Sequence, residues 1–213
     1  MQVADGIHWV DGIRFSNVYV VETGDGLLLV DTGTPWRTKR ICGFIERMGR
    51  HPCEVRHIVL THCDIDHVGS AAALKARTGA AVAMHELDAA VLTRAQRPRR
   101  RMVIVQAMYP LVVRPVTPDR LLEDGDTVGG LRVVHIPGHT DGSIALLRDD
   151  GVVFTGDALL SDEDGNVVPP HPKLAQDPAL AAASAERILS LRPRLVLTGH
   201  GAPATPGPGA SSS

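Results

Sequence analysis

The densest group of chemically active side chains lies in the stretch LTHCDIDHVGS, residues 60–70. Two histidines and two aspartates, His62, Asp64, Asp66 and His67, lie within six consecutive positions there. Imidazole and carboxylate groups bind Zn²⁺, and both groups also suit Fe and Mn. The stretch therefore predicts part of a metal centre.

Four further polar residues follow apolar runs elsewhere in the chain. They are Asp31 in VDTG, His139 in PGHTDGS, Asp157 in TGDAL and His200 in TGHG. Functional groups held on loops beyond rigid strands are a common construction of active sites. Because one loop cannot surround a metal alone, we expect ligands from these distant loops to converge.

The number of candidate ligands indicates more than one ion. Seven ligands exceed what one tetrahedral ion needs, and two ions sharing a bridging carboxylate account better for the count. We expect two divalent ions, with zinc as the first choice and iron or manganese as alternatives. The candidate metal ligands are His62, Asp64, Asp66, His67, His139, Asp157 and His200.

Strands are expected where short apolar runs end in turn residues. These runs are residues 6–10, 17–22, 26–33, 55–62, 80–85, 131–138, 143–158 (a hairpin) and 194–201. Helical spacing predicts helices over residues 38–48, 70–79, 86–94 and 177–191. Ser70 is the expected N-cap and Gly79 the expected stop of the second helix, whereas Asp177 caps the fourth. The alternation of strands and helices predicts a layered α/β domain.

The chain has no linker that would divide residues 1–205, so we expect a single domain there. Residues 94–118 mix a basic run, Arg97–Arg101, with an apolar segment and several prolines, and are expected to form a cap-like insertion. Residues 206–213 are rich in Gly, Pro and Ser and are expected to be a disordered tail.

Composition excludes several classes of function. The 213 residues are 44% hydrophobic and 22% charged, with a net charge of −2. This balance gives no electrostatic reason to expect nucleic acid or a membrane as partner, so we expect a small-molecule substrate and leave open a homodimer. The odd cysteine count (three) and the lack of a secretory signal favour a cytoplasmic protein.

Taken in order, VDTG, THCDIDHVG, PGHTDGS, TGDAL and TGHG resemble the motifs of the metallo-β-lactamase-fold hydrolases. The resemblance implies a four-layer αββα sandwich, in which two mixed β-sheets are flanked by helices. It also implies that His62, Asp64 and His139 hold one metal and that Asp66, His67 and His200 hold the other. In the same pattern Asp157 bridges the two metals, and Asp31 supports the site without necessarily binding a metal.

Asp64 departs from the usual family pattern, which has histidine at this position; the chain resembles the subgroup that reads THxDxDH. A carboxylate can bond Zn²⁺ at about the same distance as imidazole. With Asp66 and Asp157 it brings three negative charges to the site, which we expect to weaken the Lewis acid and to shift preference toward Fe²⁺ or Mn²⁺. In the alternative, Asp64 misses the metal and one well-occupied site remains.

The expected mechanism follows from the metals. Two divalent ions hold a water between them and lower its pKa toward ~7, and the resulting hydroxide attacks a carbonyl or phosphoryl centre. Asp66 is the candidate catalytic residue, because it can orient the nucleophile or take its proton. The expected reaction is hydrolysis of an ester, thioester, lactone or related acyl bond of a small molecule.

Three alternatives stay open at this point. A set of two histidines and one carboxylate, His62, His139 and Asp157, is also typical of mononuclear iron oxygenases that act on thiols or persulfides. Phosphoesterase or weak β-lactamase activity is compatible with the same residues, and the third alternative is a metal-binding domain without catalysis. Cys63 is expected to be a packed thiol, and His85 and His135 are expected to be ordinary histidines.

Overall fold

A seven-stranded sheet forms the first half of the chain. Its order is β1-β2-β3-β4-β5-β6-β7, antiparallel from β1 to β4 and parallel from β4 to β7. The strands are β1 Gln2–Ala4, β2 Ile7–Trp9, β3 Tyr19–Thr23, β4 Gly26–Val30, β5 Val55–Val59, β6 Ala81–His85 and β7 Arg120–Leu122. The computed structural model describes residues 1–96 and 103–206, and the side chains of all of these except 103–107. The basic run Arg97–Arg101 and the tail from residue 207 therefore lie outside the described residues.

A five-stranded sheet, in the order β14-β11-β10-β9-β8, forms most of the second half. It is also mixed, because β11 and β14 are parallel whereas the other neighbours are antiparallel. The strands are β8 Thr127–Val128, β9 Leu131–His135, β10 Ile144–Leu147, β11 Val152–Gly156 and β14 Leu195–Thr198. A short hairpin of β12 Leu160–Ser161 and β13 Val167–Val168 was not expected from the sequence.

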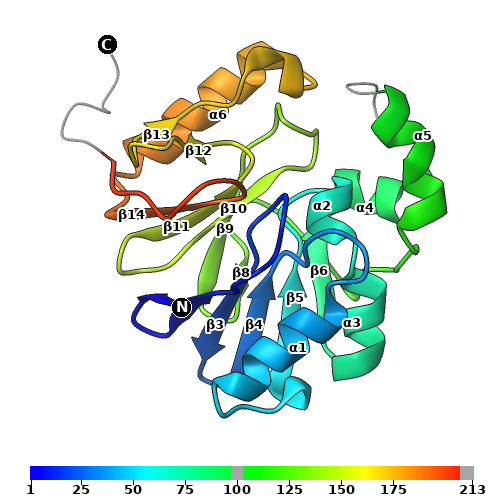
Figure 1. Cartoon of the computed structure of the whole chain (residues 1–213). Helices are drawn as coiled ribbons and strands as arrows, with labels where there is room; N and C mark the ends of the chain where they lie inside the picture. The colour runs from blue at the N-terminus through cyan, green and yellow to red at the C-terminus, as the bar shows by residue number, and fades with distance from the viewer. Residues whose placement is uncertain (97–102, 207–213) are drawn as a thin grey trace.

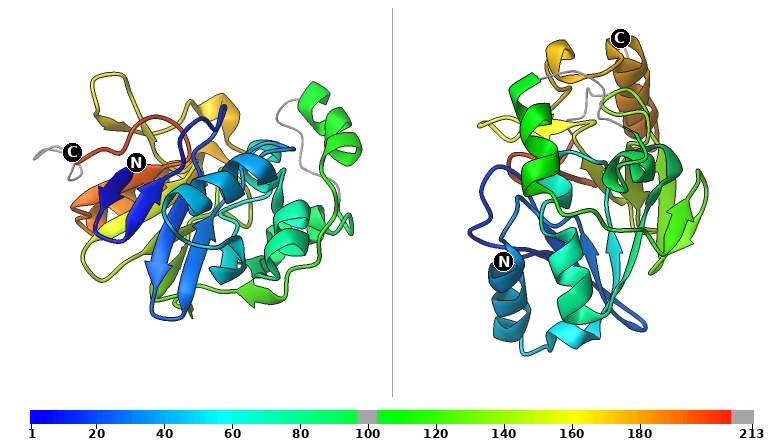
Figure 2. Two further views of the ribbon diagram at one scale, coloured as in Figure 1. Left: turned by 60° about the horizontal axis from the view of Figure 1, so that its bottom comes forward. Right: turned by 90° about the vertical axis from the view of Figure 1, so that its right-hand side faces the viewer.

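Helices cover the outer face of each sheet (Figure 1). In Figure 1 α1 and α3 lie over the first sheet and α6 lies over the second, and the further views in Figure 2 place α1 and α6 on opposite sides of the molecule. The predicted αββα sandwich is confirmed. The helices are α1 Thr38–Arg47, α2 Ile65–Val68, α3 Ala71–Thr78, α4 Glu86–Leu92, α5 Val103–Val112 and α6 Pro178–Ser190, with 3-10 turns at Pro52–Glu54 and Pro172–Leu174.

Alternate residues of the central strands face two different cores. In β4, Leu28 and Val30 join the core between the sheets, whereas Leu27 and Leu29 pack under the helices that cover the first sheet. Phe154 of β11 fills the same inter-sheet core and contacts the ring of Tyr19 edge-on. Successive side chains of a strand point to opposite faces, so a strand covered on both faces reads as an unbroken apolar run.

The helix ends follow the sequence with one exception. Asp177 accepts hydrogen bonds from the N–H groups of Ala179 and Leu180, and Gly79 ends α3 in the left-handed region at φ 76°. Ser70 precedes α3 as expected, but its side chain makes no cap hydrogen bond. Its hydroxyl bonds the loop before α1 instead, because Ser70 donates to the Thr34 carbonyl and accepts from the Arg37 N–H.

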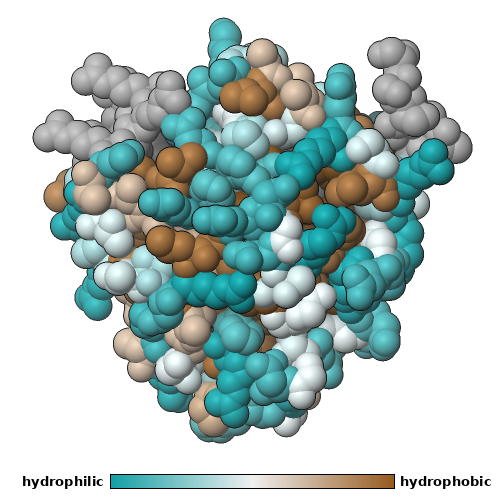
Figure 3. All heavy atoms as spheres, turned by 180° about the vertical axis from the view of Figure 1, so that it is seen from behind, coloured by the Kyte–Doolittle hydropathy of each residue, from teal (hydrophilic) through white to brown (hydrophobic). Residues whose placement is uncertain are grey.

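The segment 94–118 contains α5, which includes Pro110. Tyr109 and Val113 are buried in the core under the helices of the first sheet. The cap-like role of the segment stays a prediction. Seen from behind, the molecule shows hydrophobic residues in several patches separated by hydrophilic ones (Figure 3). In the part of the chain that the structure describes, no helix has both the length and the apolar character needed to cross a bilayer.

Candidate metal centre

The seven predicted ligands come from loops at one edge of the two sheets. His62 and Asp64 follow β5, Asp66 and His67 lie in α2, and Asp157 follows β11; His139 follows β9 and His200 follows β14. Strands β9, β11 and β14 run in the same direction, because each of β9 and β11 is antiparallel to β10 and β14 is parallel to β11. Their carboxyl ends therefore meet at one edge, and the structure brings all seven residues together there.

The first group of candidate ligands is His62, Asp64, His139 and Asp157, with one potential ligand atom from each lying within 4.8 Å of the others. Asp64 Oδ2 lies 3.1 Å from His139 Nε2 and 3.7 Å from His62 Nε2. Asp157 Oδ2 lies 3.4 Å from His139 Nε2 and 3.8 Å from His62 Nε2. Two imidazoles and two carboxylates thus lie close together, and Asp64 is one of the four.

The second group is Asp66, His67 and His200, whose potential ligand atoms also lie within 4.8 Å of one another. Asp66 Oδ2 lies 3.6 Å from His200 Nε2 and 3.9 Å from His67 Nε2. Asp157 reaches this group too, with Oδ1 at 3.1 Å from His67 Nε2 and Oδ2 at 3.2 Å from His200 Nε2. Asp157 is therefore shared between the two groups.

The donor set fits divalent cations. The Nε2 atom of His62 is buried and makes no hydrogen bond, although buried polar atoms are normally satisfied. Burial by itself would raise the pKa of the Asp157 carboxyl, but His67, His62 and a hydrogen bond from His200 outweigh it and hold this pKa well below its usual range. Burial would lower the pKa of His67, but the surrounding carboxylates, Asp157 first, raise it well above its usual value. The electrostatic field of the two groups thus favours a positively charged species between them.

Asp31 bonds the second group from behind. Its Oδ2 lies 2.7 Å from His67 Nδ1 and accepts a hydrogen bond from the Thr61 hydroxyl at 2.8 Å. Its Oδ1 accepts the Thr61 N–H at 2.8 Å, and the Thr61 hydroxyl lies 3.0 Å from His62 Nδ1. A carboxylate on the far nitrogen of a ligating histidine fixes its ring orientation and raises its basicity. Asp31 is placed where the sequence predicts a supporting residue.

Asp88 was missed by sequence reasoning, although the structure places it at the centre of the site's support. Its side chain is buried at the start of α4 and accepts hydrogen bonds from the Cys63 N–H, the Thr140 hydroxyl and the Gly142 N–H. An acidic residue in a first helical turn has an ordinary explanation in the helix dipole. The available signal was its helical spacing of four residues from the apolar Leu92, which marks an inward face.

The loop between β2 and β3 was also missed. The Asn17 side-chain amide donates to the carbonyls of Thr198 at 2.9 Å and Gly201 at 2.7 Å. The backbone N–H of Asn17 donates to the Gly199 carbonyl at 2.7 Å. The Ser16 hydroxyl donates to the Asp66 carbonyl. This loop therefore joins the backbone around Asp66 to the loop that carries His200.

Cys63, His85 and His135, which we do not expect to bind a metal, lie outside both groups of candidate ligands. Cys63 is buried, as a packed thiol would be. The rings of His85 and His135 stack on each other with centroids 4.2 Å apart and planes 7° apart. His135 Nε2 lies 2.9 Å from the Asp141 carbonyl oxygen, so this stack connects the end of β6 to the loop that carries His139.

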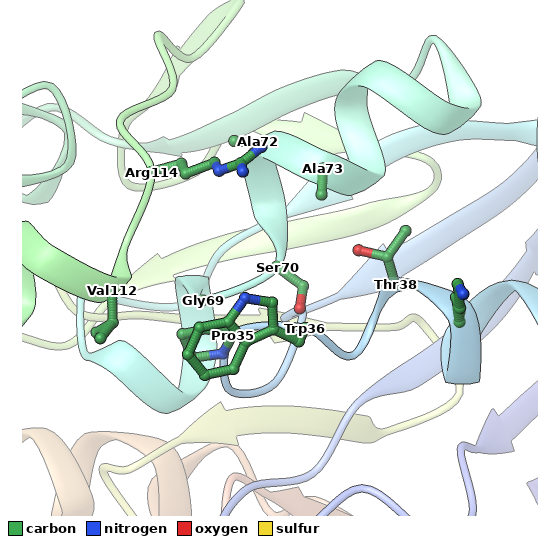
Figure 4. A pocket seen from close by; sticks show the side chains of 10 residues that line it. Pro35, Trp36, Thr38, Gly69, Ser70, Ala72, Ala73, Val112 and Arg114 are labelled. Atoms are coloured by element: carbon green, nitrogen blue, oxygen red, sulfur yellow. The ribbon is translucent and has the colours of Figure 1, made fainter.

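A pocket of about 310 Å³ lies beside α2 (Figure 4). Two cationic side chains, Lys39 and Arg114, line it together with the 84%-exposed indole of Trp36, and none of the lining residues is acidic. Figure 4 shows the Trp36 ring and the Arg114 guanidinium on different sides of the pocket. Gly69 and Ser70 also line it and directly follow α2, the helix that carries Asp66 and His67.

Fold and site together define a layered α/β metallohydrolase. Residues 11–200 match the family described as the metallo-beta-lactamase superfamily. The chain therefore belongs to the metallo-beta-lactamase superfamily, and the predicted class of enzyme, a metal-dependent hydrolase, is confirmed.

Known relatives agree with this assignment. The chain is 26% identical to the probable metallo-hydrolase YflN of Bacillus subtilis over 96% of this chain and 87% of that protein. It is 28% identical to the acyl-coenzyme A thioesterase MBLAC2 of Gallus gallus over 78% of this chain and 66% of that protein. The chain spans about three fifths of the length of several other curated relatives. The structure of TTHA1623 in a di-iron-bound form is 32% identical with a TM-score of 0.70, and the match covers 89% of each chain.

Proposed function

We propose that this chain uses two divalent metal ions to hydrolyse an acyl bond, a thioester or ester, of a small molecule. The observation that carries the proposal is the position of Asp157, whose carboxylate faces both groups of candidate ligands. Two ions held by one shared carboxylate, when bound, supply a Lewis acid for the carbonyl and an acidic water. His62, Asp64 and His139 would hold one ion, and Asp66, His67 and His200 the other.

Asp66 is one of three solvent-accessible residues of the two groups, together with Asp64 at 33% and His200 at 36% side-chain exposure, and it is the one that we propose for proton transfer. Its side chain is 28% exposed, whereas that of Asp157 is 11% exposed and that of His67 is fully buried. A general base must reach the water whose proton it takes. Asp66 meets this condition at the solvent side of the site, so we assign it the orientation of the nucleophile and the acceptance of its proton.

Zinc is our first choice of metal, with iron or manganese as alternatives. Four imidazoles suit zinc, but the groups also contain three carboxylates, Asp64, Asp66 and Asp157, which favour harder ions. The di-iron form of TTHA1623 shows that a similar chain holds iron. Asp64 is one of the four residues of the first group and is the residue that we expect to set the metal preference.

A thioester is the favoured substrate class because one relative is named an acyl-coenzyme A thioesterase. The pocket beside α2 supports a substrate with an anionic part, since Lys39 and Arg114 line it without an acidic neighbour. Guanidinium and ammonium groups are the usual partners of phosphate and carboxylate. The proposed partner is therefore an anionic small molecule, and we propose neither nucleic acid nor membrane as a ligand.

Elemental mass spectrometry of protein purified without added metal is the first test. About two ions per chain, followed by turnover of acyl thioesters or esters that Asp157→Asn abolishes, would support the proposal. A lactone, phosphoester and β-lactam panel in the same assay separates the other reactions of the superfamily. One iron per chain with oxygen consumption on thiol substrates would replace the proposal by the oxygenase alternative.

A further inference from the structure

The carboxylate of Asp88 joins two loops that come from different sheets. Its Oδ2 accepts the Cys63 N–H at 2.7 Å and the Thr140 hydroxyl at 2.8 Å, and its Oδ1 accepts the Gly142 N–H at 3.0 Å. Cys63 stands on the loop after β5 of the first sheet, whereas Thr140 and Gly142 stand on the loop after β9 of the second. Both oxygens of a 2%-exposed carboxylate are thus used to hold the two loops at a fixed separation.

The two loops carry three of the four residues of the first group. Cys63 lies between His62 and Asp64, and Thr140 directly follows His139. The second group takes its residues from α2 and from the loop after β14, which Asp88 does not contact through any hydrogen bond given by the described residues. Asp88 therefore supports the loops of the first group, whereas Asp31 bonds His67 of the second group.

The loop after β9 packs tightly against Asp88. A β-carbon on Gly142 would lie 2.7 Å from both the Asp88 N and its Oδ1, so the loop after β9 sits directly against the start of α4. An asparagine at position 88 would turn an NH₂ group toward N–H or O–H donors on at least one side. A buried donor that faces another donor loses its hydrogen bond and keeps its desolvation cost.

We infer that Asp88 is a positioning residue that sets the distance between His139 and the His62–Asp64 loop, and so selects the metal affinity of the first group alone. The inference rests on the proposed two-ion site. Loss of a hydrogen-bonding partner behind metal ligands typically weakens metal affinity by about 10–100-fold. Asp88→Asn should therefore lower the affinity for the ion of the first group by that factor and leave the affinity for the other ion unchanged.

The test is a competitive metal titration, with Zn²⁺ and a chromophoric chelator, of the wild type and four variants. Asp88→Asn should keep one tightly bound ion. Adding Asp64→Ala, which damages the same group, should cost no further ion, whereas adding His200→Ala, which damages the other group, should remove the remaining one. Asp119→Asn is the control, because the Asp119 carboxylate also accepts a backbone N–H, that of Val82, but contacts neither loop.

Thr140→Val keeps the test available if Asp88→Asn does not fold. It removes one of the three hydrogen bonds to Asp88 and should weaken the same ion by a smaller factor. An equal loss of affinity for both ions in either variant, or an unchanged affinity for both, would overturn the inference. A wild type that binds one ion would sink the two-ion proposal but not this inference, provided that Asp88→Asn weakens that ion and His200→Ala does not.

Discussion

Gly199 lies against Asp157 so closely that a β-carbon on the glycine would be 2.3 Å from Asp157 Oδ1. The same atom would lie 2.8 Å from the Cε1 atom of His67. The residue before His200 must therefore lack a side chain, because any larger residue would push the shared carboxylate away from one or both groups.

Gly199→Ala should consequently lower metal content below about one ion per chain and reduce turnover at least tenfold, while costing about 1–3 kcal/mol of stability through overpacking. Elemental analysis and thermal unfolding measure the two effects separately. Gly24→Ala is the matched control, because no atom lies within 4 Å of the added β-carbon there. Full metal content in Gly199→Ala would show that Asp157 is not shared between two ions.

Asp64→His should raise the preference for zinc over iron and manganese. Asp64 Oδ2 lies 3.1 Å from His139 Nε2, so a ligand exchanged here changes the first group directly. A neutral imidazole removes one negative charge from the site and strengthens the Lewis acid. The measurement is the zinc-to-iron ratio of protein produced in a medium that contains both metals. An unchanged ratio would argue that Asp64 does not touch the metal.

Replacing the cations of the pocket should affect substrate binding and not the metals. Lys39→Gln together with Arg114→Gln should raise KM for anionic thioesters about tenfold, with kcat nearly unchanged, because in our proposal the two cations bind an anionic part of the substrate away from the reacting bond. Arg132→Gln together with Arg192→Gln controls for the loss of two positive charges, since Arg132 lies in β9 and Arg192 follows α6, both in the second half of the chain. The KM for a neutral ester should be the same in all of these variants. An equal rise of KM for the neutral ester would refute an electrostatic role of the pocket.

Asp150 should stabilise the fold only above acidic pH. Two hydrogen bonds from Arg148, at 2.8 and 2.7 Å, lower the pKa of the Asp150 carboxyl, and Arg194 and the Val152 N–H add to the effect. A lowered pKa gives stability that is complete above the unfolded-state value of about 3.9 and is lost as pH falls toward the folded-state value.

Asp150→Asn should therefore cost about 1 kcal/mol at pH 7, a value discounted because the side chain is 37% exposed. The difference from the wild type should shrink below about pH 4. Urea unfolding at pH 7 and at pH 3 measures both values. A difference that is the same at both pH values would mean that charge plays no part.

The sequence by itself predicted the layers, and it marked the candidate ligands that the structure brings together. Alternating strand and helix patterns are local, and the polar motifs at strand ends stand out because buried strands contain almost no polar residues. Asp31 and Asp157 could therefore be found beside the glycines that end their strands. The Asp177 cap was predictable for the same reason, since its partners are two and three residues away.

Only the tertiary structure decided which residues support each group of candidate ligands. The hydrogen bond from Thr140 to Asp88 joins residues 52 positions apart, and that from Asn17 to Gly201 joins residues 184 positions apart. A single sequence carries no periodic signal for such contacts, so the sequence placed Asp88 only within a predicted helix and Asn17 at the start of a predicted strand. The packing of the two sheets against each other makes these contacts, because it brings the loops of both sheets around one point.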